Sequence, residues 1–301
     1  RFMRGHHGLK ISLVVAKLAD SKRYCLIFDT GFSGCYTDSS NAMKGEAIMY
    51  TYRDFLTTTL TAAAKIAAAN FGNLSHSVKA GDRNQVLTET DLEIGHFLTD
   101  AIRTAYPDHN IIDEELGCVD NRSRYTWVVD PIDGTSNFAV GLPQYGIMLG
   151  LLDHDTPVAG GIALPAFGEL YVATKGAGAW CNGQKIHVSH ETDLANSLVA
   201  YGIDGHPEDP ARTKREAELL GAIILSIRNL RSSNSVVDQA MVAKGAYGAC
   251  ANQTSKIWDN VAQQIIIEEA GGVYTDIAGS PMDYHDALNR SHENFTWLAG
   301  A

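Results

Sequence analysis

The chain has 301 residues, of which 45% are hydrophobic and 20% are charged, which is enough to bury a substantial core. Its 24 basic and 35 acidic residues give a net charge of −11 without any basic run, which argues against binding to nucleic acid or to an anionic membrane surface. The five cysteines are scattered and show no zinc-type spacing, which favours a reduced cytoplasmic protein with free thiols.

The predicted elements begin after an N-terminal stretch, residues 1–48, that carries no clear motif and that we interpret as an extension of unknown role. Over Tyr50–Phe71 the apolar residues follow helical spacing and alanine is abundant, which predicts an amphipathic helix ending at Gly72. A second helix is predicted over Leu92–Ala105, with Asp91 as its N-cap.

A strand-rich region follows from residue 110 to residue 190. Asn110–Ile112 is a short apolar strand that leads into the acidic run Asp113-Glu114-Glu115. The apolar runs Tyr145–Leu152 and Pro157–Ala163 are joined by a polar turn, which predicts a hairpin.

From about residue 190 onward, strands and helices alternate, which predicts an α/β layer. Helices are predicted at Arg212–Leu220, Val236–Ala243 and Val261–Ala270, and strands at Ser197–Tyr201, Ile223–Arg228 and Val273–Thr275. We therefore divide the chain into the extension (1–48), an N-terminal α+β subdomain with an antiparallel sheet (49–190) and a C-terminal α/β subdomain (191–301).

The stretch from Trp127 to Phe138 carries the strongest chemical signal. It begins as an apolar strand, passes Asp130 and Asp133, and turns at Gly134. Pro131 disfavours the α region for the residue before it, so the strand is expected to stay extended up to Asp130. Two acids on one tight turn repel each other unless a cation lies between them, and a hard cation such as Mg²⁺ suits this oxygen-rich site. Free N–H groups after Gly134 could hold a phosphate, although a plain turn is the alternative.

Two further acidic positions fit such a site. Glu114 follows an apolar strand, as Asp130 does, and acids at strand ends collect along one rim of a sheet. Asp259 stands just before the Val261–Ala270 helix, where an N-cap is the ordinary interpretation but a carboxylate could also reach a cation. Periodicity alone does not show that these acids converge.

Two motifs lie in order at a suitable separation. The first is Asp130-Pro131-Ile132-Asp133-Gly134-Thr135-Ser136-Asn137-Phe138, and the second is Trp258-Asp259-Asn260-Val261-Ala262 with Glu269-Ala270-Gly271-Gly272. They resemble the two signatures of the inositol monophosphatase family, DPIDGTxNF and WDxAA followed by EAGG. Val86–Asp91 and Asp113-Glu114-Glu115 are similar to two shorter family elements, with Asp113 where glycine is usual. The resemblance covers residues from about 50 to 299.

The resemblance implies a fold and an activity. The expected fold is a layered αβαβα sandwich of the inositol monophosphatase and fructose-1,6-bisphosphatase type, which combines α+β and α/β character and usually forms a homodimer. The expected activity is hydrolysis of a small phosphate monoester with Mg²⁺ as the cofactor, by a cytoplasmic enzyme of the lithium-sensitive, metal-dependent phosphatase superfamily.

The resemblance also assigns roles to residues. The metal ligands would be Glu114, Asp130, the Ile132 carbonyl, Asp133 and Asp259. Thr135, assisted by Asp91, would orient and deprotonate the attacking water, and Glu114 would complete the catalytic set. The phosphate would be bound at Gly134, Thr135 and Ser136.

Substrate identity stays open at this stage. By spacing, Asn252 stands where inositol-specific members have an acid that accepts sugar hydroxyls, and a nearby segment is altered to Ser232-Ser233-Asn234-Ser235. We predict that Asn234 and Asn252 bind substrate, with simple loop polarity as the alternative. The leading expectation is an inositol-1-monophosphate-like substrate. Alternatives are fructose-1,6-bisphosphate, histidinol phosphate, a 3′-phosphonucleotide, or a non-enzymatic relative that only binds a phosphorylated ligand.

Overall fold

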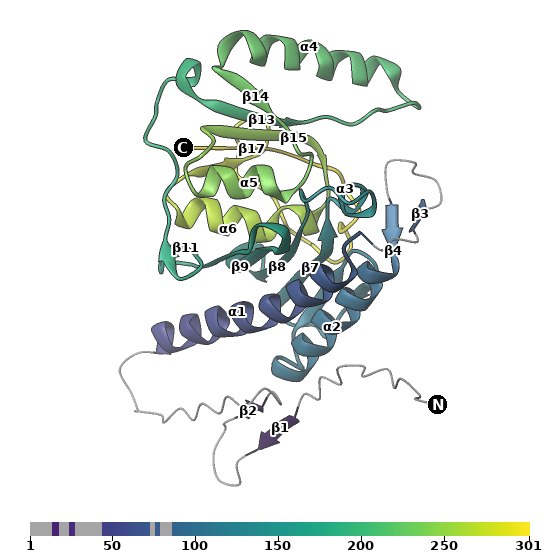
Figure 1. Cartoon of the computed structure of the whole chain (residues 1–301). Coiled ribbons are helices and arrows are strands. Elements are labelled where there is room, and N and C mark those ends of the chain that lie inside the picture. The colour runs from purple at the N-terminus through teal and green to yellow at the C-terminus, as the bar shows by residue number, and fades with distance from the viewer. Residues whose placement is uncertain (1–13, 18–23, 28–43, 73–75, 79–85) are drawn as a thin grey trace, which may run out of the picture. The chain divides into compact units, whose positions relative to one another are not determined.

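Two units make up the chain, Arg1–Lys44 and Gly45–Ala301, and Figure 1 draws their elements. In the first unit, β1 (Val14–Lys17) pairs antiparallel with β2 (Tyr24–Ile27). The remainder of the predicted extension up to residue 43 lies outside the described residues. The structure, a computed structural model, describes residues 14–17, 24–27, 44–72, 76–78 and 86–301.

Two long helices of the second unit correspond to the first two predicted helices. The helix α1 (Lys44–Asn70) starts six residues before the predicted Tyr50–Phe71 helix and ends one residue before its predicted end, and Gly72 follows in the turn with φ of +81°. The helix α2 (Glu89–Ala105) starts three residues earlier than predicted, because Thr88 is the N-cap. The prediction that Asp91 caps α2 was therefore wrong.

The N-terminus of α2 is closed by a capping box. The Thr88 hydroxyl accepts a hydrogen bond from the Asp91 N–H at 3.3 Å, and the Asp91 carboxylate accepts one from the Thr88 N–H at 2.9 Å. This reciprocal pair fixes the Asp91 side chain at the start of the helix instead of leaving it in solvent, and Asp91 is only 1% exposed.

An eight-stranded sheet occupies the middle of the chain. Its neighbours pair antiparallel except for β5 and β7, which run parallel. The predicted hairpin is confirmed as β8 and β9. In spatial order the strands are β12 (Gln184–Lys185), β11 (Ala179–Cys181), β10 (Glu169–Thr174), β9 (Thr156–Leu164), β8 (Gly146–Asp153), β7 (Tyr125–Asp133), β5 (Asn110–Asp113) and β6 (Gly117–Val119).

A five-stranded sheet follows, and β13 runs parallel to both β14 and β15. The strand predicted at Ile223–Arg228 was wrong, because most of it continues the helix α4 (Pro210–Ser226). Asp209 caps that helix and Pro210 fits its first turn, where no N–H is needed. In spatial order the strands are β14 (Asn229–Arg231), β13 (Leu198–Gly202), β15 (Ala249–Ser255), β17 (Phe295–Gly300) and β16 (Val273–Thr275).

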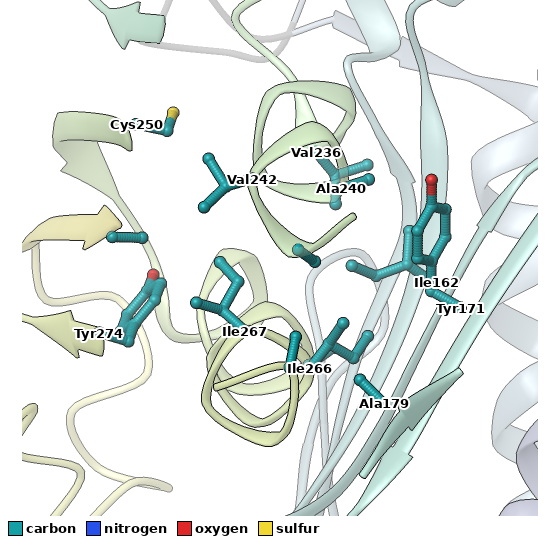
Figure 2. Packing of buried hydrophobic residues seen from close by; sticks show 14 of the residues in the cluster. Ile162, Tyr171, Ala179, Val236, Ala240, Val242, Cys250, Ile266, Ile267 and Tyr274 are labelled. Carbon is teal, nitrogen blue, oxygen red and sulfur yellow. The ribbon is translucent and has the colours of Figure 1, made fainter. Parts of the chain in front are cut away.

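The helices α5 (Val236–Ala243) and α6 (Val261–Glu269) fill the space between the two sheets. Figure 2 shows Val236 and Ala240 of α5 and Ile266 of α6 within one apolar cluster that reaches both sheets. On the other face of the large sheet, α1 and α2 cover a second cluster that is rich in aromatic residues. With α4 beside the small sheet (Figure 1), the layers confirm the predicted αβαβα sandwich.

A pair of glycines brings α6 close to the large sheet. Gly150 of β8 pairs with Gly160 of β9, and α6 crosses over both. A Cβ on Gly160 would lie 2.6 Å from Ile265 Cγ2 and 2.8 Å from the Ala262 carbonyl oxygen, closer than any side chain tolerates. The absence of side chains at these two glycines therefore allows α6 to pack close to the large sheet. The distance between helix and sheet in turn affects the position of Asp259, which lies just before α6.

Smaller elements complete the second unit. The strand β3 (His76–Val78) pairs antiparallel with β4 (Val86–Thr88). The helix α3 (Thr135–Ala139) follows β7, and short 3₁₀ turns form η1 (Pro165–Phe167), η2 (Leu194–Asn196) and η3 (Ile257–Asp259). Among the described residues, no helix combines the length and apolar content needed to cross a membrane. The subdomain boundary near residue 190 stays a prediction.

Candidate active site

The strand β7 delivers two carboxylates to one place. Asp130 pairs with Met148 of β8, but Asp133 pairs with Gly146, so the register shifts by one residue between them. In a regular strand, residues three apart point to opposite faces. A bulge changes that alternation, and the Asp130 and Asp133 carboxylates both reach the same acidic cluster.

Asp259 enters this cluster from a different layer. One carboxylate oxygen from each of Asp130, Asp133 and Asp259 lies within 4.8 Å of the others. Asp259 ends η3, and its carboxylate accepts a hydrogen bond from the Lys256 N–H. The N-cap of α6 is Asn260, so the ordinary N-cap interpretation of Asp259 does not hold.

Glu114 approaches the cluster along the neighbouring strand. Because β5 runs parallel to β7, the carboxyl end of β5 meets Asp130 at the same edge, and the Glu114 N–H donates to the Val129 carbonyl at 3.2 Å. Burial, followed by the Glu114 charge, raises the pKa of Asp130 well above its usual range. Burial, followed by the Asp259 charge, does the same to the pKa of Asp133. The cluster thus concentrates negative charge that a cation would neutralise.

One atom of the cluster shows that a divalent cation fits. Asp130 is 1% exposed, and its Oδ1 has no hydrogen-bond partner among the described residues. A buried carboxylate oxygen without a donor is costly, and a cation removes that cost. Several carboxylate oxygens at close range are the donor set that hard divalent ions take. The predicted fifth ligand, the Ile132 carbonyl, accepts a hydrogen bond from the Thr135 hydroxyl at 2.7 Å.

Thr135 and Asp91 meet beside the cluster, 44 residues apart in sequence. The Thr135 hydroxyl lies 3.2 Å from Asp91 Oδ1. Burial is the main cause that raises the pKa of Asp91 to about 6, while two hydrogen bonds from Thr88 oppose the shift. The other oxygen of Asp91 is held by the Thr88 hydroxyl and N–H, so the capping box aims the carboxylate at Thr135.

Gly134 turns the chain from β7 into α3. Its φ is +79°, in the left-handed region that favours glycine. A Cβ there would lie 2.8 Å from the Gln144 carbonyl and 2.9 Å from Ser235 Cβ, so the position has no room for a side chain. Ser136 is exposed on α3. The described residues show no ligand role for it.

Asn234 and Asn252 line a pocket that also contains part of the acidic cluster. Its lining includes Asp133, Asp259, Asn234, Asn252 and Thr254. The structure therefore brings both amides within one cavity with the acidic cluster.

The pocket also contains Asp204, which sequence reasoning missed. Asp204 follows the end of β13, as Glu114 follows β5. This acid-after-strand signal was present in the sequence, but nothing local connected residue 204 with the other segments.

Comparison with known proteins identifies the family. A family model described as the inositol monophosphatase family matches residues 50–296. The chain belongs to the inositol monophosphatase family. The predicted resemblance is thereby confirmed, and membership supports phosphoric monoester hydrolase activity.

Relatives of this inositol monophosphatase family member span most of its length. A fructose-1,6-bisphosphatase/inositol-1-monophosphatase of Aquifex aeolicus is 30% identical over 233 residues, 75% of this chain and 86% of that protein. Human inositol monophosphatase 1 is 30% identical over 237 residues, 76% of this chain and 85% of the human protein. The solved structure of a Thermotoga maritima IMPase matches with a TM-score of 0.72 and 27% identity, covering 82% of this chain and 91% of that one.

Proposed function

We propose that this chain hydrolyses small phosphate monoesters with Mg²⁺ as its cofactor. The observation that carries the proposal is the buried Asp130 Oδ1, which has no hydrogen-bond partner among the described residues and lies in a cluster with Asp133 and Asp259. Family membership supports the phosphatase class, and the acidic cluster supports the need for a metal.

Four side chains and one carbonyl would hold the metal: Glu114, Asp130, Asp133, Asp259 and Ile132. When bound, Mg²⁺ supplies a lowered water pKa and stabilises charge on the phosphoryl and leaving oxygens. Phosphoryl transfer depends mainly on positioning and electrostatics, so no covalent nucleophile is required from the protein.

Thr135 and Asp91 would direct the attacking water. When the Thr135 hydroxyl donates its hydrogen to Asp91, its oxygen is left to accept a hydrogen from water. A carboxylate with a pKa of about 6 is a stronger base than an ordinary aspartate, because burial disfavours its charged form. Asp91 Oδ1 would then receive the proton that passes through Thr135.

The turn at Gly134 would hold the phosphate. The left-handed φ at Gly134 and the helical start at Thr135 expose backbone N–H groups beside the acidic cluster. We assign phosphate binding to the Gly134 and Thr135 N–H groups, with Ser136 as a further candidate. Asn234 and Asn252 would contact the alcohol part of the ester.

The relatives guide the choice of substrate. The Aquifex protein is named for both fructose-1,6-bisphosphate and inositol-1-monophosphate, and the human protein is named for inositol monophosphate. We propose inositol 1-phosphate as the first substrate to test. We further propose a cytoplasmic homodimer, which gel filtration with light scattering would test.

The deciding experiment measures phosphate release from a panel of monophosphates and bisphosphates, with and without Mg²⁺. We expect release that depends on Mg²⁺ and that falls by about 10³-fold or more in Asp130→Asn, since that ligand lies at the centre of the cluster. Asp155→Asn, an exposed acid in the turn between β8 and β9, is the matched control and should keep full activity. Mg²⁺-dependent release at the wild-type rate by Asp130→Asn would refute the assignment.

A further inference from the structure

Asn260 stands between Asp259 and the helix α6, and its side chain is turned away from that helix. It is the N-cap residue of α6, where an asparagine usually accepts a hydrogen bond from the first helical turn. Asn260 makes no such capping bond, and its exposed fraction is 0%. Its amide is therefore engaged elsewhere, in a direction that a helix cap does not explain.

The Asn260 amide holds the segment just before η3. Its Nδ2 donates to Ser255 Oγ at 3.0 Å and to the Lys256 carbonyl, so both amide hydrogens are used. The Ser255 hydroxyl in turn donates to the Phe295 carbonyl of β17 at 3.1 Å. These bonds fasten the start of η3 to the end of β15 and to β17.

Lys256 passes this restraint on to Asp259. The Lys256 N–H donates to Asp259 Oδ2 at 2.5 Å. The Lys256 carbonyl accepts from the Asp259 N–H at 3.1 Å and also from the Asn260 amide. A backbone donor fixes the direction of a carboxylate only as well as that backbone is itself fixed. Movement of Lys256 would therefore turn the Asp259 carboxylate relative to the rest of the acidic cluster.

Tyr274 of β16 fixes the other end of the Asn260 amide. Its hydroxyl donates to Asn260 Oδ1 at 2.7 Å and accepts a hydrogen bond from Gln263 Nε2 at 2.7 Å. Its buried ring stacks on that of Trp297, with 5.5 Å between the centroids. Figure 2 shows Tyr274 in the apolar cluster that also contains Ile267 of α6. The hydroxyl is therefore carried by a ring that packing holds in place.

These side chains form a complete hydrogen-bond network. Asn260 uses both amide hydrogens and its oxygen, and the Tyr274 hydroxyl both donates and accepts. A fully paired buried network keeps one arrangement rigid, whereas a lost partner leaves a costly unpaired group. Partners of this kind, one step behind a metal ligand, orient the ligand. Asn260 occupies the position that the WDxAA signature leaves unspecified, so the motif itself does not account for this asparagine.

We propose that Asn260 is a positioning residue for Asp259. The buried amide, fixed by the Tyr274 hydroxyl, holds Lys256 so that the backbone N–H directs the Asp259 carboxylate into the acidic cluster. The inference rests on the proposed function, in which Asp259 is a ligand of Mg²⁺. It adds Asn260 and Tyr274 to the residues on which the affinity for that ion depends.

Calorimetric titration with Mg²⁺ tests each member of the network. Asn260→Leu keeps the size of the side chain but removes the amide, and its Kd for Mg²⁺ should rise about 10- to 100-fold, the usual effect of losing a partner behind a metal ligand. Tyr274→Phe removes only the hydroxyl and should raise the Kd by roughly 3- to 10-fold. Because Asn260→Leu already leaves Tyr274 without its acceptor, the double variant should bind Mg²⁺ no more weakly than Asn260→Leu alone.

Tyr284→Phe is the matched control. Tyr284 is also buried, and its hydroxyl donates to Gln264 Oε1 of α6 at 2.6 Å. The Gln264 amide continues to Glu268 at 2.8 Å, toward the end of α6 that lies away from η3. Tyr284→Phe should therefore lower stability about as much as Tyr274→Phe but leave the Kd for Mg²⁺ within about twofold. A merely structural role for Tyr274 predicts the same small change in Kd for both variants, and that result would overturn the proposal.

Hydrogen exchange on the metal-free protein separates this inference from the proposed function. The Lys256 N–H is protected while it donates to Asp259, so its exchange should be at least about 10-fold faster in Asn260→Leu than in Tyr284→Phe. If the wild type binds no Mg²⁺ or hydrolyses no phosphate ester, the proposed function fails, and this exchange rate still decides whether Asn260 holds Asp259.

Two results would contradict the role of Asn260. One is equal exchange of the Lys256 N–H in Asn260→Leu and Tyr284→Phe. The other is a wild-type Kd for Mg²⁺ in Asn260→Leu. If Asn260→Leu does not fold, Tyr274→Phe decides by the same two measurements: faster exchange and weaker Mg²⁺ binding than in Tyr284→Phe support the proposal, and equal values overturn it.

Discussion

The close approach of α6 to the large sheet makes Gly160→Ala a sharp test of the fold. The new Cβ would lie 2.6 Å from Ile265 Cγ2 and 2.8 Å from the Ala262 carbonyl oxygen, where ordinary contacts begin at 3.4 Å. The helix must therefore move by up to 0.8 Å, the difference between 3.4 and 2.6 Å. Overpacking of this kind costs about 1–3 kcal/mol.

A smaller gain in stability opposes this loss. Alanine restricts the unfolded chain more than glycine does, which stabilises the protein by about 0.4–1 kcal/mol. The net loss of unfolding free energy is then about 1–2 kcal/mol, measurable by urea denaturation. Because Asp259 lies only two residues before the first residue of α6, we also expect weaker Mg²⁺ affinity.

The matched control for this substitution lies in α4. A Cβ on Gly221 has no atom within 4 Å, so Gly221→Ala should instead stabilise the protein by about 0.5–1 kcal/mol, as alanine does in an exposed helix. If Gly160→Ala is as stable as the wild type and binds Mg²⁺ equally well, then the close packing of α6 on the large sheet does not depend on glycine at this position.

Three further predictions concern the candidate active site and the aromatic cluster that α1 and α2 cover. Thr135→Ala should lower kcat by about 10²–10⁴-fold with little change in stability, which steady-state kinetics and urea denaturation would show. Gly134→Ala should lower stability by about 1–3 kcal/mol and reduce phosphate affinity, because a Cβ would meet the Gln144 carbonyl at 2.8 Å. His109 accepts a hydrogen bond from the Trp127 indole at 3.1 Å, and burial lowers its pKa. Because the folded state disfavours charged His109, its contribution to stability is complete above the unfolded pKa of about 6.5 and is lost as the pH falls below it. His109→Gln should make denaturation midpoints less dependent on pH between about 5 and 7; an unchanged pH dependence would contradict this.

Local patterns in the sequence were sufficient to predict the helices and strands that contain such patterns. The alanine-rich pattern and Gly72 defined α1, and the apolar run before Asp130 defined β7. A strand was wrongly predicted at Ile223–Arg228, because a short apolar run fits a strand or a helix equally well. The cap at Asp209 and Pro210 decided for the helix α4.

The site needed contacts that no local pattern contains. Asp91 reaches Thr135 only because the Thr88 capping box holds it at the start of α2. Asp204 reaches Asn234 across 30 residues of sequence, through the return of the chain beside β13. Family motifs marked the acidic cluster in advance and pointed to Asn234 and Asn252, whereas Asp204 was found in the pocket only from the three-dimensional structure.

The most direct test of the account is the binding of Mg²⁺ to the acidic cluster, measured by isothermal titration calorimetry on the wild-type protein, Asp130→Asn and Asp155→Asn. We predict saturable binding to the wild type and to Asp155→Asn, and an affinity lower by about 10-fold or more in Asp130→Asn, which should remain folded by circular dichroism. Equal Mg²⁺ binding by all three proteins, or none by the wild type, would contradict the central claim that this cluster is a metal site.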